Sequence, residues 1–234
     1  MKIKTVKTRI FRPGEDLIKF VENYFPTFKE EDVLVITSKV VSLAEGRIIK
    51  KTEGLKKEDI IKKESDFFLA GKYAPITIKD GVVMMSAGID ESNANGSYIL
   101  LPKDSFKTAS NVRNYFIKKH KLKKFGVIIT DSRSIPLRRG VAGFSVGYAG
   151  IKALKDYRKS KDIFGKAFHF SVVNTIDSLA VVAVLCMGEG KEQKPLALIS
   201  EAPISFTDRI NRNELKVKVK DDMYYPIFSA KIPD

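Results

Sequence analysis

The strongest constraint on the fold is a set of short runs that are apolar almost throughout. "DVLVIT" (32–37), "FGVIIT" (125–130) and "PLALIS" (195–200) have the length and composition of strands buried on both faces. Between them lie segments whose apolar residues recur at helical spacing. These segments are 14–25, 57–70 and 105–120. Because helices and strands do not alternate regularly, the sequence predicts an α+β fold with mixed sheets and packed helices rather than a doubly wound sheet.

Several other segments refine this prediction. Residues 46–50 look extended after Gly46, and "ITIKDGVVMMSAG" (76–88) predicts a hairpin that turns at Asp80-Gly81. The glycine-rich "VAGFSVGYAG" (141–150) indicates either a close backbone approach or a sharp bend. Residues 168–190 open with alternation and continue as a long apolar helix that Gly188 ends. In the tail, "LKVKVK" (215–220) predicts an edge strand, and no internal repeat or low-complexity linker is found.

The net charge of +14 raises the question of a polyanionic partner. Lysines gather in residues 55–64 and 118–124, but no aromatic residues are interleaved as a base-stacking surface would require. We therefore favour solvated helix faces over a nucleic-acid surface, and expect the charge at most to steer nucleotides or an acidic acceptor toward a cleft. The single cysteine, Cys186, excludes an internal disulfide and a cysteine-based zinc cluster. With no secretion signal and no membrane-spanning run, we predict a cytoplasmic protein without membrane contact.

Acidic and amide side chains follow three of the apolar segments. Asp90 and Asn93 come after the strand at 81–88, Asp131 and Ser132 follow the strand at 125–130, and Glu189 follows the apolar helix. Each alone is more often a turn or helix cap. Three together favour one cleft lined by hard oxygen ligands, which suit Mg²⁺ or Mn²⁺ and thereby phosphates.

Other candidate residues carry weaker signals. The chain has neither a Walker A motif nor a G-x-G-x-x-G motif, although "SKVVSLAEGR" (38–47) could meet phosphates. Arg138 and Arg139 could grip a carboxylate or phosphate, or form surface ion pairs. His120 and His169 have no partner at ligand spacing, so His120 is expected to be exposed and neither to be catalytic. Cys186 is expected in the core.

A set of ordered blocks resembles a known family, the gamma-glutamyl ligases that join L-glutamate to coenzyme F420-0 with GTP. The resemblance runs from about residue 8 to about residue 203 and is carried by the order and spacing of its blocks. They are "GEDL" (14–17), "VLVITSKVVSLAEGRII" (33–49), "SAGIDESN" (86–93), "LLPKD" (100–104), "GVIITDS" (126–132), "PLRRG" (136–140), "VGYAGI" (146–151), "DYRKSKDIFGK" (156–166) and "MGEG" (187–190).

The resemblance implies a gamma-glutamyl ligase-like fold, with a catalytic region over 1–203 formed by one domain or two intertwined subdomains. Beyond it, we expect residues 204–234 to form an extension that packs on this region. It implies a cytoplasmic homodimer that uses GTP, or ATP, with two Mg²⁺ or Mn²⁺ ions, and K⁺ as a further candidate. Implied metal ligands are Asp90, Asp131, Ser132 and Glu189. Implied nucleotide contacts are Arg9, Ile10, Phe11, Ser38, Lys39, Asn93, Met187, Gly188 and Gly190. Asp90 and Asp131, with Arg138 assigned to the acceptor from its charge, are the predicted catalytic residues.

Three departures from the family pattern leave the acceptor open. The chain reads "SIPLRRG" (134–140) where an arginine usually precedes the proline, and it has Leu43 and Lys166 where a basic residue and an arginine are usual. The predicted function is a nucleotide-dependent ligase that adds L-glutamate to F420-0 through an acyl phosphate. The alternatives are a glutamate ligase of the same family with another acceptor, such as a small carboxylate or a peptide end, and a polyanion-binding protein without catalytic activity.

Overall fold

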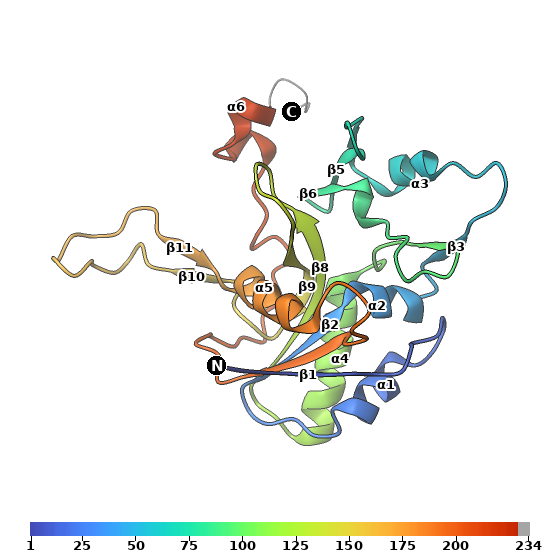
Figure 1. The fold of residues 1–234 in the computed structure, drawn as a ribbon. Coiled ribbons are helices and arrows are strands. Elements are labelled where there is room, and N and C mark those ends of the chain that lie inside the picture. Colours follow the sequence, from blue (N-terminus) through green and yellow to red (C-terminus); the bar gives the residue numbers. More distant parts are fainter. Residues whose placement is uncertain (229–234) are drawn as a thin grey trace.

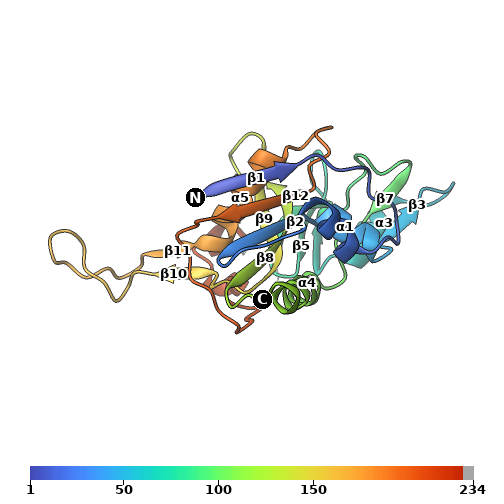
Figure 2. The same ribbon diagram turned by 90° about the horizontal axis from the view of Figure 1, so that it is seen from below.

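The computed structural model describes residues 1–228 and is built around a five-stranded mixed sheet (Figures 1 and 2). The two strands at its centre, β2 and β8, run parallel, and every other neighbouring pair is antiparallel. In spatial order the strands are β1 (Lys2–Val6), β12 (Leu196–Ser200), β2 (Asp32–Thr37), β8 (Phe125–Ser134) and β9 (Val141–Ala149). The predicted α+β fold with a mixed sheet is confirmed.

Helices cover both faces of this sheet, so its central strands are buried on either side. Leu34 and Ile36 of β2 face the core shared with α1, α2 and α4, whereas Val33 and Val35 face α5. Figure 1 shows α5 above the sheet and α1 below it. The helices are α1 (Leu17–Tyr24), α2 (Ser38–Ala44), α4 (Ser105–His120) and α5 (Thr175–Met187).

Local capping fixes where these helices begin and end. The carboxylates of Asp16 and Asp104 accept backbone N–H groups of the first turns of α1 and α4, and the Asn174 amide does the same for α5. Gly188 ends α5 with a φ of +84°, a conformation that favours glycine. The prediction that Gly188 ends the apolar helix is confirmed.

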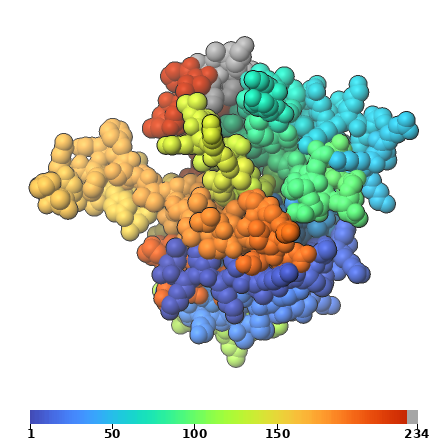
Figure 3. All heavy atoms as spheres, in the orientation of Figure 1, coloured from blue at the N-terminus to red at the C-terminus, as the bar shows by residue number. Residues whose placement is uncertain are grey.

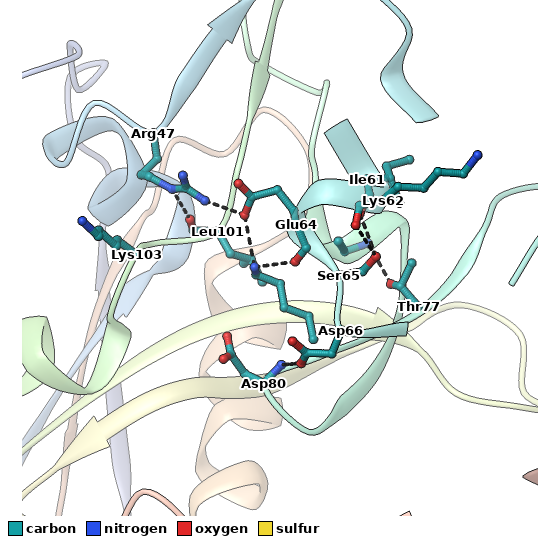
Figure 4. Close-up of polar contacts among 12 residues, drawn as sticks. Arg47, Ile61, Lys62, Glu64, Ser65, Asp66, Thr77, Asp80, Leu101 and Lys103 are labelled. Atoms are coloured by element: carbon teal, nitrogen blue, oxygen red, sulfur yellow. Dashed lines mark hydrogen bonds and ion pairs between the residues drawn. The ribbon is translucent and has the colours of Figure 1, made fainter. Parts of the chain in front are cut away.

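A smaller lobe carries the short strands and α3. In it β5 and β6 form the predicted hairpin, with positive φ at Asp80 and Gly81. A polar network ties the lobe to the segment after α2, because Arg47 donates to Glu64 (2.6 Å) and to the Leu101 carbonyl (3.0 Å), and Lys79 also donates to Glu64 (Figure 4). Its elements are β3 (Ile48–Lys50), α3 (Lys57–Glu64), β4 (Phe67–Leu69), β5 (Ile76–Lys79), β6 (Val82–Met85), η1 (Ser86–Gly88) and β7 (Ser97–Ile99).

Two further parts complete the described chain. An arm between β10 (Leu154–Asp156) and β11 (Val172–Asn174) stands away from the body (Figures 1 and 3). The tail from residue 204 contains η2 (Val219–Asp221) and α6 (Tyr225–Phe228) and is held by Asp208, which accepts from the buried Arg113 (2.6 Å). The division into 1–203 and an extension over 204–234 stays a prediction, and its last six residues lie outside the described ones.

Two predicted elements are wrong. The helix predicted over 57–70 ends at Glu64, because the Ser65 hydroxyl donates to the Ile61 carbonyl and residues 67–69 pair with β5 instead. The edge strand predicted over 215–220 is absent from the described sheets, and a turn and η2 occupy the segment. An alternating pattern predicts a strand only where a sheet edge is free to pair with it.

Two predicted burials are also wrong. Cys186 is exposed, because it lies on the outer face of α5 beside Leu185, which is 80% exposed, while Ala183 and Met187 face the core. His120 is half-buried against Phe28 and Phe116, and its Nε2 has no hydrogen-bond partner within residues 1–228. No helix formed by those residues combines the length and the apolar character that crossing a bilayer requires.

Candidate active site

A cavity of about 670 Å³ opens where the large sheet meets the smaller lobe. Its walls come from five distant parts of the sequence: the segment 8–11, the start of α2, the segment 88–101, the end of β8 and the loop 187–195. The Asn93 side chain donates to the Gly190 carbonyl (3.3 Å), which joins two of these walls, and the surfaces of residues near 90 and 190 lie against each other in Figure 3. A cavity of this size accommodates a small-molecule ligand.

Asp90 reaches the cavity through an unusual turn. Ser86, Ala87 and Gly88 all have positive φ (53°, 52° and 69°), a left-handed turn that costs free energy for the two non-glycine residues. The buried Thr77 hydroxyl holds this turn, because it accepts the Ala87 N–H (2.8 Å) and donates to a β6 carbonyl. The "SAG" sequence therefore turns the chain sharply after β6 and delivers Asp90 to the cavity wall.

The Asp90 carboxylate is surrounded by donors. It accepts the ammonium of Lys39 (2.6 Å) and both the N–H (2.6 Å) and the hydroxyl (3.1 Å) of Ser92. Burial raises the pKa of Asp90, but these contacts outweigh it and leave that pKa below its ordinary value. Asp90 is therefore ionised at neutral pH.

Asp131 has the opposite environment. It lies within β8 just beyond an irregularity between Ile129 and Thr130, which changes the pairing with β9. Burial and the neighbouring carboxylates of Asp90 and Glu189 raise the pKa of Asp131 to about 7, against the lowering effect of the Ser132 N–H, which it accepts at 2.9 Å. A half-buried carboxyl beside two acids is a position that a bound cation would stabilise.

Glu189 comes from the loop that follows α5. Its carboxylate accepts the Ser132 hydroxyl (3.2 Å), so the loop and β8 meet at this point. The loop is folded on itself, because the Glu192 carboxylate accepts the Gly190 N–H (2.8 Å) and lies where a Cβ on Gly188 would be. The positive φ at 188 favours glycine, whereas the flexible Glu192 side chain could move away from an added Cβ.

These groups form an oxygen-rich set of the kind that Mg²⁺ and Mn²⁺ prefer. Asp90, Asp131, Ser132 and Glu189 line one cavity, and the donor set fits such an ion because Asp131 has no basic hydrogen-bond partner within residues 1–228. In that same part of the chain, no three acid, histidine or cysteine side chains already stand as ligands around one point. Binding of a metal ion by these residues would therefore require side-chain rearrangement.

The structure places the predicted nucleotide contacts around the same cavity. Phe11 is buried beneath it, and the Arg9 guanidinium lies over the Phe20 ring and pairs with Glu15 (2.7 Å). Arg138 is different, because it lies at the exposed tip of the β8–β9 hairpin and does not line the cavity. The residues that do line it are Arg9, Ile10, Phe11, Ser38, Lys39, Asn93, Met187, Gly188 and Gly190.

Sequence reasoning missed two buried hydroxyls in the cavity wall. The hydroxyl oxygens of Ser42 and Thr130 are inaccessible and have no hydrogen-bond partner within residues 1–228. Their positions carried a signal, since Ser42 lies one helical turn after Ser38 and Thr130 pairs with Thr37 on the neighbouring parallel strand. Both are small polar residues beside a predicted site residue.

Comparisons with known proteins point to the same family that the sequence blocks lining the cavity resemble. The sequence model of the F420-0:gamma-glutamyl ligase family matches residues 5–60 and 55–201. The chain is 34% identical to the coenzyme F420:L-glutamate ligase of Methanococcus maripaludis, over 94% of this chain and 96% of that protein. It is 32% identical to the enzyme of the same name from Archaeoglobus fulgidus (81% and 83% covered) and 30% identical to that from Methanocaldococcus jannaschii (91% and 92% covered).

Proposed function

The chain belongs to the F420-0:gamma-glutamyl ligase family, and from that premise we propose that it joins L-glutamate to the carboxylate of coenzyme F420-0 at the expense of GTP. The observation that carries the proposal is the convergence of Asp90, Asp131 and Glu189 on one cavity. These acids come from a strand, a turn and a loop far apart in sequence, and a role in packing alone would not bring them together.

The reaction has two displacements. A carboxylate oxygen of the acceptor attacks the γ-phosphorus of GTP, the bond to the β-phosphate oxygen breaks, and GDP leaves an acyl phosphate behind. The glutamate amine then attacks the acyl carbon, loses a proton, and forms the amide as inorganic phosphate departs. The first step is needed because a free carboxylate does not react with an amine in water, whereas an acyl phosphate does.

The chain's own residues would hold and orient the phosphates. Asp90, Asp131, Ser132 and Glu189 would hold divalent cations, which offset the charge of the phosphate oxygens when bound. Lys39, on the first turn of α2, adds a positive charge beside Ser38 on the same wall. Phe11 and Leu43 give this wall an apolar part that suits a planar base.

The test is an incubation of the protein with GTP, L-glutamate, F420-0 and Mn²⁺ or Mg²⁺, followed by mass spectrometry. We expect product heavier than F420-0 by one or more glutamyl residues, released together with GDP and phosphate, and no product when EDTA is present. Product formed equally well without divalent metal would overturn the metal assignment. Replacing GTP by ATP under the same conditions would define the nucleotide.

A second acceptor class is favoured by one observation. Leu43 lines the cavity at a position where the family resemblance has a basic residue. A panel of small carboxylates and acidic peptides in place of F420-0 separates the two possibilities. Glutamate transfer to one of these, with none to F420-0, would reassign the acceptor while keeping the ligase chemistry.

A further inference from the structure

The Lys39 side chain occupies a position that the proposed chemistry requires for a cation. Its ammonium lies 2.6 Å from Asp90 Oδ2, 2.9 Å from the Ser92 carbonyl oxygen and 3.2 Å from Ser92 Oγ. An ammonium has three N–H donors, so these three oxygens satisfy it completely. The contact is partly shielded, since the Lys39 side chain is 25% exposed and that of Asp90 is 40% exposed.

A carboxylate, a carbonyl and a hydroxyl oxygen converging on one positive charge resemble the coordination of a hard cation. An ammonium in contact with Asp90 weakens the binding of a divalent ion to the same carboxylate, because the two positive charges repel. Lys39 also acts on Asp131 from a distance by lowering its pKa, so its charge is felt by both carboxyl groups. The acidic side of the cavity is thus partly neutralised by the protein itself.

We propose that Lys39 serves as an internal counter-ion of Asp90, and that a divalent cation displaces this ammonium only when nucleotide phosphates offer it a new partner. This inference rests on the proposed function. Lys39 and Ser38 line the same cavity from the first turn of α2, so a released Lys39 side chain stays within it. The consequence is ordered loading, in which metal ion and nucleotide enter as a complex and the ion alone binds weakly.

The experiment measures Mn²⁺ binding by electron paramagnetic resonance, with and without a non-hydrolysable GTP analogue, for the wild type and Lys39→Met. Removal of the competing ammonium should tighten the binding of Mn²⁺ alone by about tenfold. The same variant should bind the Mn²⁺–nucleotide complex more weakly, because the phosphates lose a charged donor. The two effects have opposite signs, and a merely structural role for Lys39 would not produce that pattern.

Lys191→Met is the matched control for loss of charge. Lys191 lines the same cavity but forms no ion pair within residues 1–228, so its removal should leave the binding of Mn²⁺ alone nearly unchanged. Lys39→Gln keeps hydrogen-bond donors but not the charge, and it should bind Mn²⁺ alone as tightly as Lys39→Met does. It provides a second test if Lys39→Met fails to fold. Thermal unfolding of each variant verifies the fold.

The outcomes separate this inference from the function on which it rests. If wild-type protein binds the Mn²⁺–nucleotide complex but both Lys39 variants bind Mn²⁺ alone no more tightly than wild type, the counter-ion role is wrong and the ligase function stands. If wild-type protein binds neither Mn²⁺ nor the complex, the proposed function itself fails. Equal tightening in Lys191→Met would show a general effect of charge and would also overturn the role of Lys39.

Discussion

The two ends of the β8–β9 hairpin differ sharply, although one pair of strands forms both. The part of the hairpin that packs in the sheet, from residue 125 to residue 132 and called the base below, carries Asp131 and Ser132 to the cavity after fully buried residues such as Ile129. At its tip, residues 134–140 are exposed, and within residues 1–228 the one hydrogen bond of Arg138 runs from its backbone N–H to the Ile135 carbonyl. Packing against the core fixes the conformation of the base, whereas the conformation of the tip depends mainly on the contacts within its own turn.

Close packing explains the difference. A Cβ on Gly143 would lie 2.7 Å from the Ala180 carbonyl oxygen of α5, and a Cβ on Gly147 would lie 2.6 Å from Ser105 at the start of α4. The backbone of β9 therefore touches a helix on each side of the sheet. Such a support fixes the backbone that carries Asp131, whereas a side chain at the tip has to be ordered by whatever it binds.

The largest expected effect comes from removing the charge of Asp131, the half-buried acid at the base. Asp131→Asn keeps the shape of the side chain but removes the charge that would face a metal ion and the transferring phosphoryl group. We expect ligase activity to fall by about 1,000-fold or more, measured as product formed in the coupled incubation with F420-0.

Glu91→Gln is the control for that variant. Glu91 directly follows Asp90, but it pairs with Lys51 and Lys57 outside the cavity, so its loss should change activity by no more than about twofold. Full activity in Asp131→Asn would contradict the metal assignment. A comparable loss in both variants would point to general electrostatics instead of a site.

That these acids line one cavity could be predicted from the sequence, because each follows a strong apolar segment and active-site groups usually lie where a rigid scaffold ends. The sequence predicts this strand only to residue 130, whereas Asp131 and Ser132 continue β8 because they pair with β9. The Lys39–Asp90 pair and the left-handed turn at 86–88 were also out of reach. Both depend on segments that only tertiary structure brings together.

The second prediction uses the raised pKa of Asp131 as a probe of the base. The unfolded chain ionises this group near 3.8 and the metal-free folded chain near 7. Between those values the folded state keeps a proton that the unfolded state has lost, so the contribution of Asp131 to the free energy of unfolding falls as the pH rises and levels off above pH 7. The Asp131→Asn variant does not show this pH-dependent loss of stability, because asparagine does not ionise.

Urea unfolding in EDTA at pH 5 and pH 8 measures the effect. Relative to wild type, Asp131→Asn should gain about 2 to 3 kcal/mol of stability between these two pH values. Other groups titrate equally in both proteins and cancel in the difference. A difference that stays constant with pH would mean that Asp131 is not held in the environment described for it.

A third prediction compares two glycines of the same hairpin. Gly143→Ala forces a methyl group against the Ala180 carbonyl and the Val184 side chain, and should cost about 2 kcal/mol of unfolding free energy. Gly140→Ala, at the tip, meets no atom within 4 Å and bears only the strain of its φ of +91°, about 1 kcal/mol. Denaturant midpoints at unchanged m-values measure both, and equal costs would remove the contrast between base and tip.

The smallest expected effect is at the tip itself. Because Arg138 does not line the cavity, Arg138→Ala should leave affinity for the Mn²⁺–nucleotide complex within about twofold of wild type. Arg9→Ala is the matched comparison. Because Arg9 lines the cavity, its removal should lower that affinity about tenfold.

The KM for the acceptor is the second readout for the tip. A higher KM in Arg138→Ala with unchanged nucleotide affinity would assign the tip to acceptor binding. A tenfold loss of nucleotide affinity would instead show that the tip reaches the nucleotide, and the two ends of the hairpin would then belong to one site.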